Sequence, residues 1–216
     1  VNVDLATEYY RQGRMDVALA NLKKALRADP ESVDANSLIA LVYSRIDKKD
    51  LAREHFEIAV EHVPSDVDTY GQVHNNFGAF LCANKKYDKA FKYLNRALLN
   101  PVYSDRGEVY ENMGVCSQEQ GNIKVAREYY IQAISLKPNL GTSLLAVAQL
   151  DFDAKKIESA EKYLKYYTRV AKQTPQSLWL GILIARTKKD KKTVESLSWS
   201  LDRKFPESKE TLILKR

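Results

Sequence analysis

A spacing of about 34 residues recurs along this chain and restricts the folds open to it. One set of large apolar, small and aromatic residues appears first as Leu5, Ala6, Tyr9, Ala18, Leu22, Ala25 and Pro30, with Gly13 at its middle. The same set returns as Ile39, Ala40, Tyr43, Ala52, Phe56, Ala59 and Pro64. Periods of roughly 20 to 50 residues indicate solenoids and other repeat architectures, in which each repeat is one supersecondary unit.

The order of residue types within the period predicts two helices and a turn. Small residues stand where the helices would cross and large ones beside them, the pattern of the tetratricopeptide repeat (TPR). The third repeat shows Phe77, Gly78, Leu81, Ala90, Leu94 and Ala97, and the fourth shows Tyr110, Met113, Gly114, Gly121, Ala126, Tyr130, Ala133 and Pro138.

Two weaker repeats follow. The fifth has Leu144, Val147, Ala148, Ala160 and Leu164, but Tyr167 where a small residue is expected, and the sixth has Trp179, Gly181, Ile182, Val194, Leu201 and Pro206. Terminal repeats are atypical because one face caps the stack. We therefore predict an all-α, right-handed superhelical TPR solenoid of about six helix–turn–helix units, forming a single domain over residues 1–216. Its repeats span about 1–32, 33–66, 71–104, 107–140, 141–174 and 175–208.

The prolines follow the same period. Each is expected near the end of a second helix, where proline stops the helix because it lacks an N–H and disfavours helical geometry in the preceding residue. The six are Pro30, Pro64, Pro101, Pro138, Pro175 and Pro206. The stretch from Pro64 to Gln72, with Asp66, Asp68 and Gly71, predicts a longer loop at the solenoid edge.

Composition supports a folded chain without a membrane span. Of the 216 residues 44% are hydrophobic, no apolar run approaches the roughly 18 residues of a span, and no signal segment opens the chain. The chain is expected to be soluble. Because it begins at Val1, an upstream segment is expected to have been removed.

The net charge of +6 is concentrated in the last third of the chain. Residues 155–216 hold 16 Lys or Arg against 7 Asp or Glu, whereas the preceding residues are slightly acidic. The densest group is Arg186, Lys188, Lys189, Lys191 and Lys192. This candidate basic patch could meet an acidic partner, nucleic acid or anionic lipid, or could be a solvated turn between two helices.

No catalytic pattern is present, and no enzyme, cofactor or metal is expected. The sequence has no glycine-rich phosphate loop after a strand, no Gly-x-Ser-x-Gly and no His-Glu-x-x-His. Cys82 and Cys116 lie on the predicted first helices of neighbouring repeats. They predict buried free thiols in a reducing compartment or a disulfide in an oxidising one, and the residues alone leave both open.

The concave face of a TPR solenoid is the predicted partner groove. It is lined by recurring positions of the first helices, here of mixed chemistry: Tyr10, Asp34, Ser37, Leu41, Arg45, Gln72, Asn75, Asn76, Glu108, Glu111, Asn112, Gln118, Gln149 and Phe152. The positions that would form a cationic clamp for a terminal carboxylate lack lysine and arginine. A chaperone-tail clamp is therefore disfavoured.

Several stretches resemble one particular family. Asn75-Asn76-Phe77-Gly78-Ala79-Phe80-Leu81-Cys82, Tyr87-Asp88-Lys89-Ala90 and Asn100-Pro101-Val102-Tyr103 resemble the central signature of the type IV pilus biogenesis and stability lipoproteins, pilotin-like TPR proteins of Gram-negative bacteria. Asn112-Met113-Gly114-Val115-Cys116, Leu178-Trp179-Leu180-Gly181 and Phe205-Pro206-Glu207-Ser208 extend the likeness along the chain.

The resemblance implies a protein-interaction scaffold rather than an enzyme. It implies a lipid anchor, absent from this sequence, at the periplasmic face of the outer membrane, and support of secretin assembly and pilus stability, with the secretin and other pilus assembly proteins as partners. It further implies a Cys82–Cys116 disulfide and a functional groove around Asn75 and Asn76, although asparagines there also serve to satisfy backbone groups. The alternatives are a cytosolic co-chaperone adaptor and an RNA-binding helical repeat. The predicted groove carries acidic residues where RNA binding would need cations, which argues against RNA. These residues are Asp34, Glu108, Glu111 and Glu119.

Overall fold

The computed structural model describes residues 2–64, 70–99 and 103–215, and these ranges contain thirteen α-helices and no β-strand. Pro101, Asp66 and Asp68 lie outside these residues, as do Asn100 and Val102 of the family-like signature. Of the loop predicted from Pro64 to Gln72, residues 65–69 lie outside them, whereas Gly71 and Gln72 belong to a helix that begins at Tyr70, so the prediction was wrong at that end. First helices of the repeats are α1 (Asn2–Arg11), α3 (Val33–Arg45), α5 (Tyr70–Ala83), α7 (Arg106–Glu119), α9 (Gly141–Asp153) and α11 (Pro175–Thr187). Second helices are α2 (Met15–Ala28), α4 (Lys49–Glu61), α6 (Tyr87–Leu99), α8 (Ile123–Leu136), α10 (Ile157–Val170) and α12 (Lys191–Lys204), followed by α13 (Lys209–Leu214).

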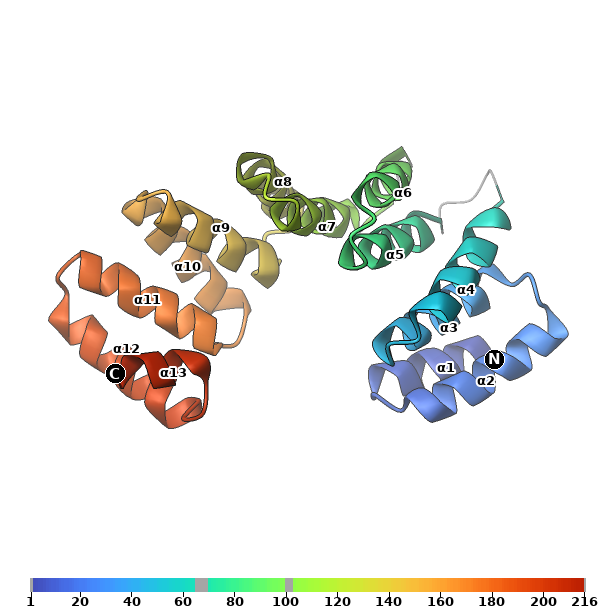
Figure 1. The fold of residues 1–216 in the computed structure, drawn as a ribbon, viewed down its shortest axis with the longest axis horizontal. Coiled ribbons are helices and arrows are strands. Elements are labelled where there is room, and N and C mark those ends of the chain that lie inside the picture. The colour runs from blue at the N-terminus through green and yellow to red at the C-terminus, as the bar shows by residue number, and fades with distance from the viewer. Residues whose placement is uncertain (1, 65–69, 100–102, 216) are drawn as a thin grey trace. The chain divides into compact units, whose positions relative to one another are not determined.

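The all-α fold of six helix pairs is confirmed (Figure 1). The chain divides into two compact units, Val1–Asn112 and Met113–Arg216, and α7 contributes residues to both. We describe the N-terminal unit and the C-terminal unit separately. Within each, a first helix packs against its own second helix and against the following repeat. The single continuous domain over residues 1–216 stays a prediction.

In the turn between the two helices of each repeat, one residue has a positive φ in the left-handed region. Gly13 and Gly121 have φ values of 78° and 82°, and the four other turns place a non-glycine residue near 60°. In the second repeat the backbone N–H of Lys48 donates to the carbonyl of Tyr43 and that of Asp47 to Ser44, so the end of α3 keeps its hydrogen bonds while the chain reverses. The four non-glycine residues are Asp47, Lys85, Lys155 and Lys189.

Close helix crossings explain three of the glycines. A Cβ on Gly78 would lie 2.7 Å from the side chain of Leu94, and one on Gly114 would lie 2.6 Å from the ring of Tyr130. Gly181 has the same relation to Leu197, at 2.9 Å. In each pair the glycine precedes its partner by 16 residues, so the crossing recurs with the repeat. The small residue that the sequence pattern demands lets the two helices of a repeat approach.

Four prolines follow second helices as predicted, whereas Pro175 has a different role. Pro30, Pro64, Pro138 and Pro206 each lie two or three residues past a second helix. Pro175 instead begins α11, where Thr174 and Ser177 form a reciprocal capping box. Proline is favoured at a first helical position because the N–H it lacks would have no partner there. The prediction that Pro175 ends a helix was therefore wrong.

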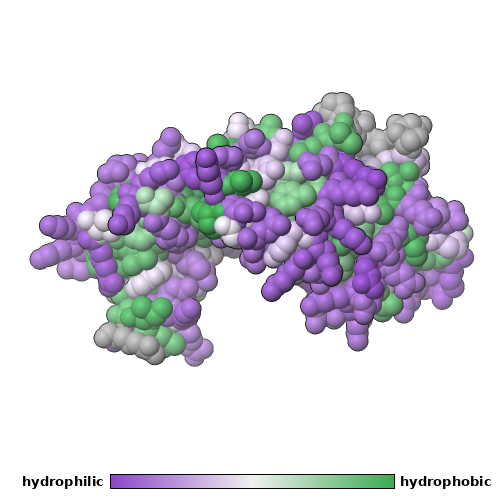
Figure 2. Space-filling model, turned by 45° about the horizontal axis from the view of Figure 1, so that its top comes forward, coloured by the Kyte–Doolittle hydropathy of each residue, from purple (hydrophilic) through white to green (hydrophobic). Residues whose placement is uncertain are grey.

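The core follows the repeat pattern. In the N-terminal unit the ring of Phe56 stacks on Phe77, 5.2 Å between ring centres, so the second repeat is joined to the third by aromatic packing. In the C-terminal unit, buried clusters centre on Val147, Leu180 and Leu201. The face drawn in Figure 2 is mostly hydrophilic with interspersed hydrophobic side chains.

Candidate partner groove

The first two repeats bring Tyr10 and Arg45 of the predicted groove together. The Arg45 guanidinium lies 5.4 Å from the centre of the Tyr10 ring. Ser37 is buried and Leu41 half-buried on the helix that carries Arg45. A cation over an aromatic face is attracted by the ring quadrupole, which holds both side chains in one orientation. This end of the predicted groove therefore presents a fixed aromatic and cationic pair.

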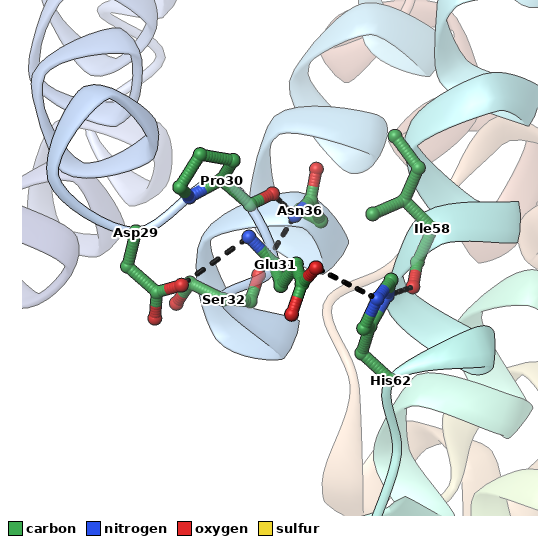
Figure 3. Close-up of polar contacts among 7 residues, drawn as sticks. All are labelled: Asp29, Pro30, Glu31, Ser32, Asn36, Ile58 and His62. Carbon is green, nitrogen blue, oxygen red and sulfur yellow. Dashed lines mark hydrogen bonds and ion pairs between the residues drawn. The ribbon is translucent and has the colours of Figure 1, made fainter.

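The linker between repeats one and two is fastened by a buried amide (Figure 3). Asn36, 1% exposed, donates to the carbonyl oxygens of Pro30 and Ser32 at 2.9 and 3.0 Å. Its Oδ1 accepts a 2.8 Å hydrogen bond from Nδ1 of His55, so that ring carries its proton on Nδ1. Burial lowers the pKa of His55, which favours its neutral form.

The same linker faces the end of α4 through Glu31 and His62. His62 Nδ1 contacts the carbonyl oxygen of Ile58 at 3.0 Å, and its Nε2 lies 3.5 Å from Glu31 (Figure 3). The backbone hydrogen bond to Ile58, aided by the charge of Glu31, raises the pKa of His62. Beside them, Asp34 of the predicted groove lines a hollow of about 410 Å³.

Predicted groove residues of the third and fourth repeats form an amide network with Tyr103. Asn112 donates to Oδ1 of Asn75 at 2.8 Å, and Gln72 donates to Asn76 at 2.9 Å. The Tyr103 hydroxyl donates to Oε1 of Gln72 at 3.1 Å, and burial raises its pKa, so it remains a donor at any physiological pH. The side chain of Asn75 is only 2% exposed. Asn75 therefore positions Asn112 rather than offering a free contact.

Glu108 and Glu111, which were predicted to line the groove, lie on α7, the same helix as Asn112. Both side chains interact with neighbouring residues. The charge of Glu108 contributes to the raised pKa of Tyr103. Both carboxylates are half-buried. The sequence pattern identified Asn75, Asn112 and Gln72 together, but it selected Tyr103 only through family resemblance, because Tyr103 lies in a linker.

The C-terminal unit contains an open groove of about 780 Å³. Its sides come from α7, α9 and the start of α11, and the rings of Tyr130 and Tyr167 lie at its base together with Leu145. Gln118 and Gln149, both predicted, line its rim. The full lining is Val115, Gln118, Glu119, Tyr130, Gly141, Thr142, Leu145, Ala146, Gln149, Tyr167, Ala171, Thr174 and Gln176. We call this the glutamine groove.

Hydrogen bonds fix the aromatic base of the glutamine groove. The Tyr130 hydroxyl donates to Oε1 of Gln118 at 3.0 Å, which leaves the amide protons of Gln118 available. The Tyr167 hydroxyl donates to the carbonyl of Lys172 at 2.7 Å. Tyr167, where the repeat pattern expects a small residue, thus forms part of the base of the groove. Sequence reasoning missed this role, although the anomaly itself was the signal.

Phe152, the last predicted groove residue, has a structural role. It packs against the cluster of Ala148, Ala160, Leu180 and Ile184. Its neighbour Asp151 is fully buried and bonded by Arg127 at 2.7 and 2.9 Å. This tie between α8 and α9 was not predicted.

The predicted basic patch lies at the turn from α11 to α12, and its cations differ in surroundings. Lys188 forms an ion pair with Glu161 at 2.7 Å, while Lys189 occupies the left-handed turn position. The guanidinium of Arg186 lies 5.6 Å from the Trp179 ring. Lys191 and Lys192 begin α12, behind the capping residue Asp190. The patch is therefore part solvated turn and part ion pair.

Both cysteines are disulfide-bonded, and neither is a free thiol. Cys82 on α5 and Cys116 on α7 are each buried, and they are the only cysteines of the sequence. Among the described residues, no group of three or more His, Cys, Asp or Glu could hold a metal ion. None of the helices within those residues has the length and apolar character needed to cross a membrane.

Comparisons with known proteins place the chain among TPR proteins. Tetratricopeptide repeat models match residues 3–67 and 69–139. The chain is 31% identical over 208 residues to the type IV pilus assembly protein PilF of Pseudomonas aeruginosa, covering 96% of this chain and 81% of that protein. A solved structure of P. aeruginosa PilF aligns with a TM-score of 0.88 at 29% identity, covering 99% of this chain and 95% of the other. PilW, a widely conserved type IV pilus biogenesis factor, aligns with a TM-score of 0.86 at 27% identity over 100% of this chain and 97% of its own.

Proposed function

Because this chain belongs to the TPR family that includes the type IV pilus assembly protein PilF, we propose that it is a non-enzymatic scaffold that binds proteins during type IV pilus biogenesis. More specifically, we propose that it supports assembly and stability of the secretin multimer, and so of the pilus. It would act at the periplasmic face of the outer membrane, held by a lipid anchor outside the sequence given. The secretin and other pilus assembly proteins are the proposed partners.

The glutamine groove is the observation that carries the proposal. Its base is apolar and aromatic, while Gln118, Gln149 and Gln176 supply amide groups at the rim. An amide side chain offers both a donor and an acceptor, so it can pair with the backbone of an extended peptide. Apolar area supplies binding free energy, and a few placed polar groups set orientation. This combination suits an unstructured segment of a partner protein.

The charge of the groove restricts the kinds of partner segment that could bind there. Among its lining residues only Glu119 is charged. A terminal carboxylate or a phosphate backbone would therefore find no cation there. An uncharged or weakly basic segment with apolar side chains fits best, which argues against both a chaperone-tail clamp and an RNA groove.

The disulfide supports the proposed compartment. We propose that Cys82 and Cys116 pair with each other, since they are the only two cysteines and both are oxidised. Disulfides persist in the periplasm and are rare in the cytosol, where thiols are kept reduced. A cytosolic adaptor would be expected to carry free thiols instead.

A capture experiment from cell-envelope extract tests the function. The full-length, lipidated protein is used as bait, and the captured material is scored for the secretin and for other pilus components. Thr142→Arg with Gln149→Arg places two long cations in the glutamine groove and should abolish capture. Gln132→Arg with Thr187→Arg makes the same chemical change at exposed positions outside the groove and should leave capture intact. Recovery of no pilus component by the unaltered protein would refute the pilus role.

A further inference from the structure

Beyond the glutamine groove, α10 and α12 of the C-terminal unit carry matching rows of cations and exposed rings. On α10 the row is Lys162, Tyr166 and Arg169, and on α12 it is Lys192, Trp199 and Arg203. Residues spaced by three, four or seven positions lie on one face of a helix. Tyr166 is 37% exposed and Trp199 is 61% exposed, the latter an unusual position for an indole. We call these two rows the basic-aromatic face.

Each exposed ring is held by its own cations. Arg203 lies 5.0 Å from the centre of the Trp199 ring. Lys162 and Arg169 lie 5.9 and 5.7 Å from the Tyr166 ring. Side chains stacked in this way are ordered before any ligand arrives, so less conformational entropy is lost on binding.

The two helices lie on either side of one cavity. It has a volume of about 290 Å³, with Leu164 and Lys165 contributed by α10 and Leu197 by α12, over a floor from α11. At its end, Nζ of Lys204 on α12 donates to Oε1 of Gln173, just beyond α10, at 2.6 Å. The rows therefore lie on the two helices that border this cavity, whose lining is part apolar and part polar and includes Lys165.

The cations of this face are not neutralised by neighbouring carboxylates. In the part of the chain that the structure describes, the cations of the two rows and Lys165 form no ion pair. The carboxylates nearby are mostly engaged: Glu161 with Lys188, Asp202 with Lys215, and Asp190 with the start of α12. Glu158 and Glu195 are the nearby carboxylates that still offset part of the charge of these cations. The face therefore keeps a net positive charge that an anionic ligand could offset.

We propose that the basic-aromatic face docks onto an anionic phospholipid surface. Cations near a charged leaflet and amphipathic rings at the headgroup level are the two elements of interfacial binding. Exposed aliphatic side chains favour lipid over nucleic acid or an acidic protein. Val170 ends α10, and Leu212 and Ile213 lie on α13, which the Lys215–Asp202 ion pair fastens to α12. Figure 2 shows hydrophobic side chains at the surface near the C-terminal end of the chain. Phosphate contacts would make no use of them.

Vesicle flotation with the 216-residue chain tests this proposal without any lipid anchor. Binding is expected to vesicles of phosphatidylcholine mixed with phosphatidylglycerol, and not to phosphatidylcholine alone. Lys162→Gln, Arg169→Gln and Arg203→Gln together should weaken that binding on the order of 100-fold, at about fivefold for each cation. The matched control is Lys23→Gln, Lys24→Gln and Arg27→Gln on α2, which removes the same charge from exposed positions of the other unit.

Indole fluorescence provides a second readout at the proposed contact. Emission should shift to shorter wavelength on mixing with the anionic vesicles, and Trp199→Phe should remove the shift. Leu99→Ala, which shortens another exposed side chain, should leave it in place. Thermal unfolding of each variant checks that the fold persists.

Three results would overturn the proposal: no binding to anionic vesicles, equal losses in the triple variant and its α2 control, or binding without a change at Trp199. Retention of single-stranded RNA or polyglutamate by this face in place of vesicles would likewise assign it to another class of ligand. None of these results depends on capture of pilus components, so the proposed function is tested separately.

Discussion

Arg127 of α8 donates two hydrogen bonds to the fully buried carboxylate of Asp151 on α9. Its Nε and one terminal nitrogen lie 2.7 and 2.9 Å from the two carboxylate oxygens, and Ser159 of α10 donates to the same group at 2.6 Å. Burial by itself would raise the pKa of Asp151, but the hydrogen bonds from Arg127 and Ser159 outweigh it and lower that pKa. The Asp151 carboxylate thus links three successive helices of the C-terminal unit, α8, α9 and α10.

Removing Arg127 should destabilise the chain strongly. Arg127→Met leaves the Asp151 carboxylate buried without a counter-charge, and we expect a loss of about 3–5 kcal/mol in the free energy of unfolding. Changing Asp151→Leu as well should recover much of that loss, because an apolar pair of similar volume avoids the desolvation cost. Urea unfolding of the single and double variants measures both effects.

The ion pair between Lys188 and Glu161 provides the matched control. It joins the same kinds of charge at 2.7 Å but is about half exposed. Lys188→Met should therefore lower the free energy of unfolding far less than Arg127→Met does. Equal losses from Arg127→Met and Lys188→Met would contradict the assignment of the buried pair as the structural tie.

The close crossing of Gly114 and Tyr130 makes a second prediction. Gly114→Ala should cost about 1–3 kcal/mol, because the new Cβ would meet the rigid ring 2.6 Å away and the helices must separate. The repeat itself suggests the rescue, since the fifth repeat has Ala148 and Leu164 at the corresponding positions. In a Tyr130→Leu background, Gly114→Ala should cost little. A double-mutant cycle on denaturant unfolding measures this coupling, and purely additive losses would count against the crossing.

The repeat pattern predicted the helices well because each repeat obeys the same local packing rule. Small residues at crossings, left-handed turns at Gly13 and Gly121, and prolines after second helices all depend on near neighbours in sequence. Pro175 departs from this rule because it comes five residues after the end of α10, at the first position of the next helix, which Thr174 caps.

The candidate site was predicted less completely, because its polar contacts join residues from different repeats. The spacing identified Gln118 and Gln149 as groove residues, but it gave no sign that Tyr130 and Tyr167 form the base between them. Asp151 stands where the first two repeats carry Tyr9 and Tyr43. A carboxylate at a buried aromatic position was the available signal, and its partner Arg127, 24 residues earlier, could be found only in three dimensions.

The contact between His62 and Glu31 predicts a pH-dependent term in stability. The pKa of His62 is raised above its ordinary value of 6.5, chiefly by the hydrogen bond to the Ile58 carbonyl, so the folded chain holds this proton more tightly than the unfolded chain. The stabilisation is fully present below pH 6.5 and is lost as the pH rises through the folded pKa. Denaturant midpoints of the unaltered chain and His62→Gln should differ under acidic conditions and converge under alkaline ones. Titration of the His62 ring by NMR should show a lower pKa in Glu31→Gln.

Oxidation of Cys82 and Cys116 should stabilise the chain. If the two pair with each other as proposed, the bond closes a loop of about 34 residues, and such cross-links typically contribute about 2–4 kcal/mol by restricting the unfolded chain. Cys82→Ala with Cys116→Ala should lower the free energy of unfolding by that amount, and reductant should then have no further effect on the variant. Each single alanine variant should expose one thiol to alkylation only after unfolding, because both positions are buried. Peptide mapping of the unreduced chain checks the pairing directly: a cross-linked peptide containing both cysteines is expected, and full alkylation of the native, unreduced protein would contradict it.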